Sequence, residues 1–251
     1  MKNNIYSWVP TPRYLCRKAA SLELLKTIRK GKFLEIGIGA GDFISKLFEM
    51  GYCGLGIDLS DEAIDLTKKR IKNINNHIEI KKQDFFEINE KFDIVFAFEL
   101  MEHFENDKKF LIKINNLLNK SGHFIFSVPA RKNMWDINDV WAGHFRRYEK
   151  KEIELKLKKC NFEVLQNYSY GFPTVNLIKP IRNSLINKKN IAKKNQPNNT
   201  LKSGVDRNYI KKFSSLINEY TMMPSILIQK MFYNFDFGDG YVVLAKKIEK
   251  E

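Results

Sequence analysis

A short apolar run that breaks into alternating glycines places the tightest constraint on the fold of this chain. Residues 33–42 are FLEIGIGAGD, so the apolar segment ends in Gly37, Gly39 and Gly41, and apolar residues with helical spacing follow. Buried parallel strands have such apolar runs, and glycine allows a turn whose backbone closely approaches a ligand. The pattern therefore predicts a strand, a turn and a helix, which form the first half of a nucleotide-binding βαβ unit.

The next strand, expected at 54–58, narrows the choice of ligand. It ends in Asp58, at about the 20-residue spacing at which an acid binds ribose hydroxyls in such units. The dinucleotide fingerprint G-x-G-x-x-G fits less well, because Gly41 comes one residue early and Asp42 takes the place of the last glycine. Glu35 would also repel a pyrophosphate, whereas it suits an ammonium or sulfonium group. These details disfavour a NAD-dependent enzyme.

Three segments together carry a family resemblance: acid-x-G-x-G-x-G from Glu35, Glu-x-x-Glu-His at 99–103, and HFRRY at 144–148. With them the chain resembles the class I (Rossmann-like) S-adenosylmethionine (SAM)-dependent methyltransferases, and within these the small-molecule methyltransferase subgroup. The resemblance implies SAM as the cofactor. It also implies an α/β fold with a seven-stranded, mostly parallel, doubly wound sheet.

The periodicity of apolar residues agrees with this fold. Helical spacing predicts helices at 14–28, 60–74, 107–118 and 149–159, the second of them capped by Ser60. Apolar runs predict further strands beginning at 77, and at 92–98, 122–129, 161–165 and 240–245. The run at 92–98 is almost unbroken, so we expect it at the centre of the sheet.

The chain divides into four parts on this pattern. Residues 1–30 form an N-terminal extension and a leading helix, 31–170 the SAM-binding core, 171–238 an inserted helical cap between strands six and seven, and 239–251 the last strand. The cap has eleven Lys or Arg and three Asp or Glu, hence a net charge of 11 − 3 = +8. Its apolar spacing predicts helices near 175–185, 210–220 and 224–232, with disorder at 188–203. We expect the cap to cover the substrate pocket, although its basic character would equally suit an anionic membrane.

The resemblance also implies which residues hold the cofactor. On the leading helix and at the glycine turn, towards the amino-acid end, these are Tyr14, Arg17, Glu35, Gly37, Gly39 and Gly41. After the second strand, at the ribose, they are Asp58 and Leu59. After the third strand, at adenine, they are Asp84 and Phe85, and Glu99 follows the fourth strand.

For transfer to a protonated acceptor, the sequence offers His144 as the general base and His103 as a reserve, with Tyr148 to orient the acceptor. Imidazole can hold and pass a proton near neutral pH. No group of Cys, His or acidic residues has metal-ligand spacing, so no metal site is expected. Methyl transfer itself is an in-line displacement, in which positioning and desolvation supply most of the catalysis.

The acceptor class is the most open part of the prediction. A small molecule methylated at oxygen, nitrogen or carbon is favoured. The net charge of +14 also suggests an RNA methyltransferase, but the excess is mostly Lys rather than Arg, which disfavours nucleic acid. The third hypothesis is a non-catalytic SAM-binding protein that docks on a membrane through the cap. Three scattered cysteines and the lack of a signal segment predict a cytoplasmic protein.

Overall fold

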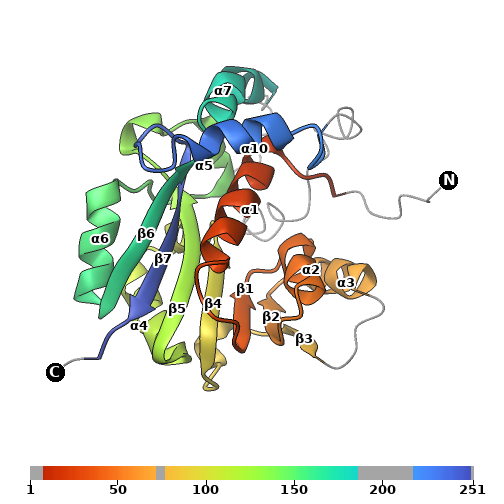
Figure 1. Ribbon diagram of the computed structural model, residues 1–251, viewed down its shortest axis with the longest axis vertical. Coiled ribbons are helices and arrows are strands. Elements are labelled where there is room, and N and C mark those ends of the chain that lie inside the picture. The colour runs from red at the N-terminus through yellow and green to blue at the C-terminus, as the bar shows by residue number, and fades with distance from the viewer. Residues whose placement is uncertain (1–7, 72–76, 186–216, 250–251) are drawn as a thin grey trace.

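The computed structural model describes residues 8–71, 77–185 and 217–249, and these form one seven-stranded sheet with helices on both faces (Figure 1). The strand order is β3-β2-β1-β4-β5-β7-β6. The strands are β1 (Phe33–Ile36), β2 (Gly54–Asp58), β3 (Ile78–Lys82), β4 (Phe92–Phe98), β5 (Leu118–Pro129), β6 (Phe162–Tyr170) and β7 (Gly240–Lys247). Only β7 runs antiparallel to its neighbours, so the predicted mostly parallel fold is confirmed.

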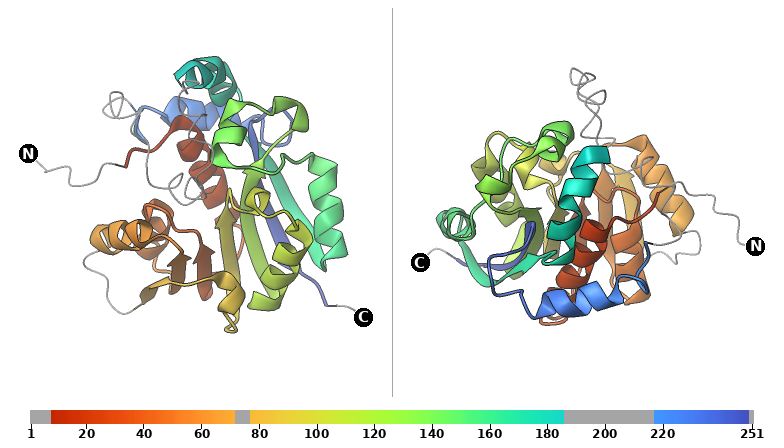
Figure 2. Two further views of the ribbon diagram at one scale, coloured as in Figure 1. Left: turned by 180° about the vertical axis from the view of Figure 1, so that it is seen from behind. Right: turned by 90° about the horizontal axis from the view of Figure 1, so that it is seen from above.

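The helices cover the sheet in two layers (Figure 2). One apolar core joins the sheet to α1 (Pro12–Leu25), α2 (Asp42–Glu49) and α3 (Asp61–Arg70), and the other joins it to α4 (Asp107–Leu117) and α6 (Lys150–Lys159). Strand β4 lies between the cores, where Ile94 and Phe96 face the first and Val95 and Ala97 the second. Burial on both faces is the reason for its unbroken apolar sequence.

The segment between β6 and β7 leaves and returns at one edge of the sheet. Strand β6 ends at Tyr170 and β7 begins at Gly240, and these residues pair beside the carboxyl end of β5. Helices α7 (Thr174–Leu185) and α10 (Met223–Lys230) lie at this edge, at the top of Figure 1. They confirm two of the predicted cap helices. Most of the helix predicted near 210–220, and the segment 188–203, fall outside the described residues.

Helix α10 packs on the leading helix α1. Gln229 is buried in this contact, and its side-chain amide donates to the backbone oxygen of Cys16 at 3.0 Å. At the surface, Lys230 Nζ lies 3.0 Å from Glu23 Oε2. The contact fixes α10 above the carboxyl edge of the sheet, where ligands bind in open α/β folds.

Some predicted boundaries differ from the observed ones. Ser60 caps α3 as predicted, since its hydroxyl accepts from Ala63 N–H at 3.3 Å, but the helix ends at Arg70. Strands β5 and β6 are longer than predicted, because the added residues are largely polar: Asn119, Lys120 and Ser121 in β5, and Gln166, Asn167 and Ser169 in β6. Among the described helices none is both long and apolar enough to cross a membrane.

Candidate active site

The glycine turn lies at the carboxyl end of β1, and its glycines are needed for different reasons. Gly37, Gly39 and Gly41 all have positive φ, which disfavours residues with side chains. A Cβ on Gly41 would lie 2.5 Å from Thr67 Oγ1, so α3 packs directly on the turn. A Cβ on Gly37 would meet nothing nearer than 4.0 Å, where Leu100 lies. Packing therefore requires Gly41, whereas Gly37 keeps a space open.

Asp58 is fixed beside this turn. Its Oδ2 accepts from Gly39 N–H at 3.0 Å and its Oδ1 from Ser60 N–H at 2.9 Å. Burial raises the pKa of Asp58, and these hydrogen bonds oppose the shift. Each carboxylate oxygen has a further lone pair for another donor. Leu59, the next residue, is about half exposed.

Glu35 and Arg17 place an acid and a cation at the same edge. Glu35 is buried in β1, and its Oε2 has no hydrogen-bond partner among the described residues. Burial raises the pKa of Glu35 well above its ordinary value, although the charge of Arg17 opposes this. The Arg17 guanidinium lies 5.1 Å from the ring centre of Tyr14 and 5.4 Å from that of Phe98, and within the described chain it donates no hydrogen bond. Both groups can therefore take a ligand partner.

Tyr14, the other predicted residue on α1, is engaged within the protein. Its hydroxyl donates to Asp42 Oδ2 at 2.8 Å, and Lys18 Nζ lies 2.6 Å from the same oxygen. Asp42 begins α2, so these contacts join α1 to the helix that follows the glycine turn. Burial raises the pKa of Tyr14 well above its ordinary value, which keeps the hydroxyl a donor. The structure thus gives Tyr14 a role in positioning the turn.

Glu99, at the end of β4, is surrounded by partners. It forms an ion pair with Arg13, and its Oε1 accepts from the hydroxyls of Ser127 at 2.8 Å and Tyr170 at 3.2 Å. Burial would raise the pKa of Glu99, but the charges of Arg13 and Arg17 and the hydrogen bond from Arg13 act together to lower it. Arg13 also donates through Nε to Asp239 Oδ2 at 2.7 Å. Glu99 is therefore an ionised carboxylate that links β4, α1 and β6.

His144 and His103, the predicted bases, lie together at this edge. Their ring centres are 4.9 Å apart, and Glu102 Oε1 lies 3.8 Å from His144 Nε2. The other nitrogen of His144, Nδ1, lies 2.8 Å from Asp139 Oδ1. Burial and the nearby His144 lower the pKa of His103 to about 4, so its imidazole is neutral at pH 7. Burial raises the pKa of Glu102 well above its ordinary value.

The expected adenine side requires one revision. Asp84 follows β3 and accepts from Phe86 N–H at 2.9 Å, which begins the 3-10 helix η1 (Phe85–Glu87). Phe85 is only 5% exposed and packs edge-on against Phe104 and Phe110. Phe86 is 43% exposed. Because Phe85 belongs to the core, Phe86 is the ring with a surface that a ligand can reach.

Tyr148 does not lie in the site, and its predicted role is wrong. It is fully buried in the second core, and its hydroxyl donates to Asp107 Oδ2 at 3.2 Å. The phenol that would have oriented the acceptor instead holds α4. Arg147, the preceding residue, is buried as well and donates to Asp139 Oδ2 at 2.8 Å. Of the HFRRY segment, His144 alone joins the cluster with Glu102 and His103.

Four residues that the sequence analysis passed over belong to the site or support it: Arg13, Glu102, Asp139 and Asp239. Glu102 stood within the quoted Glu-x-x-Glu-His stretch, so its position was available. Asp139 lies on the short helix α5 (Ile137–Ala142), five residues before His144, and gave no such signal. Arg13 and Asp239 meet only through the folding of distant segments.

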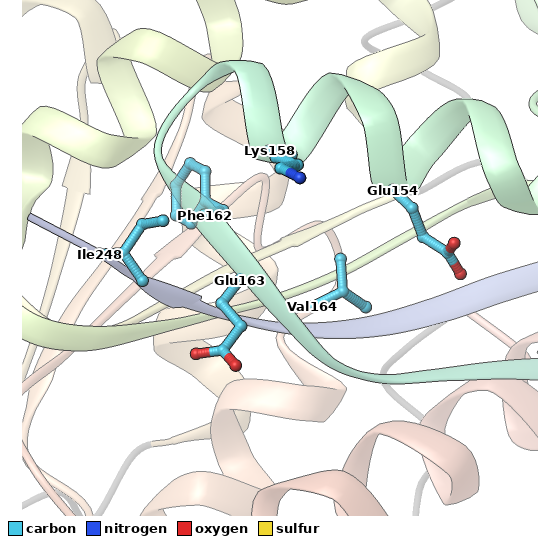
Figure 3. A pocket seen from close by; sticks show the side chains of 6 residues that line it. All are labelled: Glu154, Lys158, Phe162, Glu163, Val164 and Ile248. Carbon is cyan, nitrogen blue, oxygen red and sulfur yellow. The ribbon is translucent and has the colours of Figure 1, made fainter. Parts of the chain in front are cut away.

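A surface hollow lies far from these residues. It is lined by parts of α6 and β6 and by the residue after β7, namely Glu154, Lys158, Phe162, Glu163, Val164 and Ile248 (Figure 3). Phe162 begins β6, so the hollow lies at the opposite edge of the sheet from the glycine turn. It includes no residue of the predicted site, and we place the candidate active site at the carboxyl edge.

Solved structures share this architecture. The N-methyltransferase NodS of Bradyrhizobium japonicum, in complex with S-adenosyl-L-homocysteine, aligns with 93% of this chain and 86% of its own at a TM-score of 0.57 and 15% identity. The [4+2]-cyclase SpnF aligns with 93% of this chain and 81% of its own at a TM-score of 0.57 and 13% identity. At such identities the likeness shows the fold alone, and the fold accommodates different reactions.

Sequence relatives narrow the family. An uncharacterized protein of Methanocaldococcus jannaschii is 31% identical over 145 residues, 57% of this chain and 63% of that protein. A ubiquinone biosynthesis O-methyltransferase of Pelagibacter ubique is 29% identical over 111 residues, 43% of this chain and 46% of the enzyme. Each match thus spans less than two thirds of the relative. The family model described as a methyltransferase domain matches residues 10–167, more than half of the chain. The chain belongs to the methyltransferase domain family.

Proposed function

We propose that the protein is a SAM-dependent methyltransferase that acts on a hydroxyl group of a small molecule. One observation carries the proposal: within the described part of the chain, Glu35 has a buried oxygen without a hydrogen-bond partner, next to an open glycine turn and to Arg17, whose guanidinium contacts only aromatic rings there. SAM has an ammonium, a carboxylate and a sulfonium in one compact end. An acid and a cation with unused capacity complement that end, whereas a pyrophosphate would be repelled by Glu35.

Each of these residues is expected to bind a different part of the cofactor. Arg17 binds the carboxylate of the methionine part, and Glu35 favours the cationic groups beside it. Asp58, already held by the turn, accepts from the ribose hydroxyls through its remaining lone pairs. We expect Asp84 to accept from the amine of adenine and the exposed ring of Phe86 to lie against the face of the purine. SAM supplies a methyl group on a sulfonium, which an acceptor displaces in line.

A hydroxyl acceptor is favoured by the cluster of Glu102, His103 and His144. A neutral amine needs no proton removed before it attacks, but a hydroxyl becomes a good nucleophile only as it loses its proton. The cluster offers acceptors for a proton at the carboxyl end of β4. The similarity to ubiquinone biosynthesis O-methyltransferases supports the same substrate class. Helices α7 and α10 cover this edge and would contact the acceptor.

The alternatives differ in testable ways. Eight of the eleven basic residues of 171–238 lie outside the described residues, so the structure adds nothing to the RNA hypothesis. Binding of RNA would weaken steeply with salt. A non-catalytic protein would bind SAM and transfer no methyl group to any acceptor, with or without His144.

Calorimetric titration with SAM and with NAD tests the proposal. We expect SAM to bind with a dissociation constant of about micromolar, and NAD not to bind. Glu35→Gln should weaken SAM binding at least about tenfold by removing the charge. Glu90→Gln is the matched control, because Glu90 is an exposed acid paired with Lys32. Binding of NAD without binding of SAM would contradict the proposal.

A further inference from the structure

Three potential metal ligands converge near the end of β4. Glu102 and His103 lie on the 3-10 helix η2 (Met101–His103), and His144 follows α5 (Ile137–Ala142). One donor atom from each lies within 4.8 Å of the others. The two segments are joined by a backbone hydrogen bond from Phe145 N–H to the oxygen of Glu102 at 2.9 Å. The convergence is therefore held by the main chain.

The cluster lacks the partners that buried polar groups require. Glu102 is completely buried, yet among the residues that the structure describes neither of its carboxylate oxygens has a hydrogen-bond partner, and His103 Nδ1 also has none. A buried polar atom without a partner costs about 1–3 kcal/mol, and more if it is charged. Two such residues side by side point to a ligand that both would bind.

The orientation of His144 suits a cation as that ligand. Asp139 is held by Arg147, whose Nε donates to Oδ2 at 2.8 Å, and its Oδ1 lies 2.8 Å from Nδ1 of His144. When Nδ1 donates to this carboxylate, Nε2 is the ring nitrogen that presents a lone pair. Nε2 lies 3.8 Å from Glu102 Oε1, which is too long for a direct hydrogen bond. A cation between them would contact both atoms.

The geometry favours a metal ion. Ligands about 2.0–2.2 Å from one metal lie about 3.0–4.3 Å apart, so the 3.8 Å separation of His144 Nε2 and Glu102 Oε1 already fits. Every pair of these donor atoms lies within 4.8 Å, so a shift of at most a few tenths of an ångström brings all three within reach of one ion. Metal-binding histidines commonly donate their second nitrogen to a carboxylate, as His144 does to Asp139. Arg147 fixes that carboxylate in turn, at 2.8 Å.

We propose that Glu102, His103 and His144 bind one divalent first-row transition-metal cation, of the type of Mn²⁺ or Co²⁺. Two imidazoles and one carboxylate suit these ions better than Mg²⁺ or Ca²⁺, which prefer oxygen ligands. Three protein ligands leave coordination positions open. The role of the metal ion rests on the proposed function. A cation here favours the ionised form of an acceptor hydroxyl, whose proton passes to solvent.

Metal binding is tested on the full chain without SAM or acceptor. Protein freed of metal with EDTA is titrated with Co²⁺ alone, followed by calorimetry and by visible absorption, which reports coordination by nitrogen and oxygen. We expect about one equivalent to bind with a dissociation constant of about 10 μM or tighter. Glu102→Gln and His103→Asn should each weaken binding by at least about tenfold, since each removes a ligand.

The control is His123→Asn, which removes a histidine from β5 at the opposite edge of the sheet and should bind Co²⁺ as the wild type does. Thermal unfolding of every variant shows whether it is folded, and one folded ligand variant suffices for the comparison. No Co²⁺ or Mn²⁺ binding at about 1 mM, or undiminished binding by the ligand variants, would overturn the metal site and leave His144 as a direct base. SAM binding, measured separately, decides the proposed function: a protein that binds Co²⁺ and not SAM retains the metal site alone.

Discussion

The carboxylate of Asp239 lies 2.7 Å from the guanidinium of Arg13, although 226 positions separate the two residues in the chain. Asp239 is fully buried immediately before β7 and also accepts from Arg147 at 3.3 Å. Arg13 extends from α1 to Glu99 at the end of β4. One arginine thus joins the leading helix to the carboxyl edge of the sheet, and both acids remain compensated although they are out of water.

Arg13→Gln should therefore unfold the protein more easily. The variant leaves Glu99 and Asp239 with less compensation, and breaking a buried pair typically costs about 3 kcal/mol or more. Urea denaturation measures the loss as a lower midpoint with an unchanged slope. Lys26→Gln removes the exposed pair with Glu23, at 3.5 Å, and should change stability by less than about 0.5 kcal/mol. Equal stabilities for the two variants would show that the Arg13 pair contributes little.

Glu35 should make SAM binding depend on pH. Its pKa in the folded, ligand-free protein is raised by burial, so the folded state holds a proton that the unfolded chain has already released. The ligand-free protein then loses stability as pH rises from the unfolded pKa towards the raised folded pKa. A cationic ligand favours the carboxylate instead. Binding should release a proton, and affinity should increase with pH over the same window.

Calorimetry in buffers of different ionisation enthalpy counts the released protons. Glu35→Gln has no proton to release at this position, so the contribution of Glu35 should vanish in this variant. Asp61→Asn provides the control, since Asp61 is an exposed acid paired with Lys82. A wild-type protein that binds SAM with no pH dependence beyond that of Glu35→Gln would exclude the buried acid from the cofactor site.

Two alanine substitutions in the glycine turn should fail in different ways. Gly41→Ala places a Cβ 2.5 Å from Thr67 Oγ1 and should destabilise the fold, because the backbone of Thr67 lies 2.9 Å away and cannot yield cheaply. Gly37→Ala meets open space and costs only the strain of positive φ, about 1–2 kcal/mol. Its Cβ would occupy ligand space, so SAM binding should fall at least about tenfold while the protein remains folded. Thermal unfolding and calorimetry, done on both variants, separate the two effects.

Alanine substitutions of Phe85 and Phe86 should likewise have different effects on stability and on SAM binding. Phe85→Ala removes a ring from the core and should cost about 3–5 kcal/mol of stability. Phe86→Ala removes an exposed ring and should leave stability nearly unchanged. If Phe86 lies against adenine, its loss weakens SAM binding but not the binding of methionine, which lacks the purine. Equal losses for both ligands would place Phe86 outside the adenine site.

The fold followed from local patterns because each pattern had one physical cause. The unbroken apolar run at 92–98 came from burial on both faces of β4, and the alternating glycines came from a turn with positive φ. Each of these two signals is contained within ten residues of sequence. The lengths of β5 and β6 were underestimated, because the missed residues at the start of β5 and the end of β6 are largely polar and do not continue the apolar run.

The site was less predictable, because its side chains depend on contacts across the chain. His144 could be named from its motif, but its partner Asp139 lies outside the motif, on the short helix α5. Tyr148 stood in the same motif, yet the side chain turns into the core and meets Asp107 on α4. No spacing along the chain separates these two outcomes. Only the packing of α4 and α6 against the sheet decides which of the two residues faces the site.

Asp139 and Asp107 offer a paired test of the support given to His144. Both acids are buried and bound to cations, Asp139 to Arg147 at 2.8 Å and Asp107 to Lys156 at 2.9 Å. Replacement of either by Asn should therefore cost stability. Asp139→Asn also removes the acceptor that fixes the Nδ1 hydrogen of His144, so Co²⁺ affinity should fall by about 10–100-fold. Asp107→Asn leaves His144 untouched, and its Co²⁺ affinity should equal that of the wild type. If both variants lose stability and neither loses affinity, Asp139 holds the loop without orienting the imidazole.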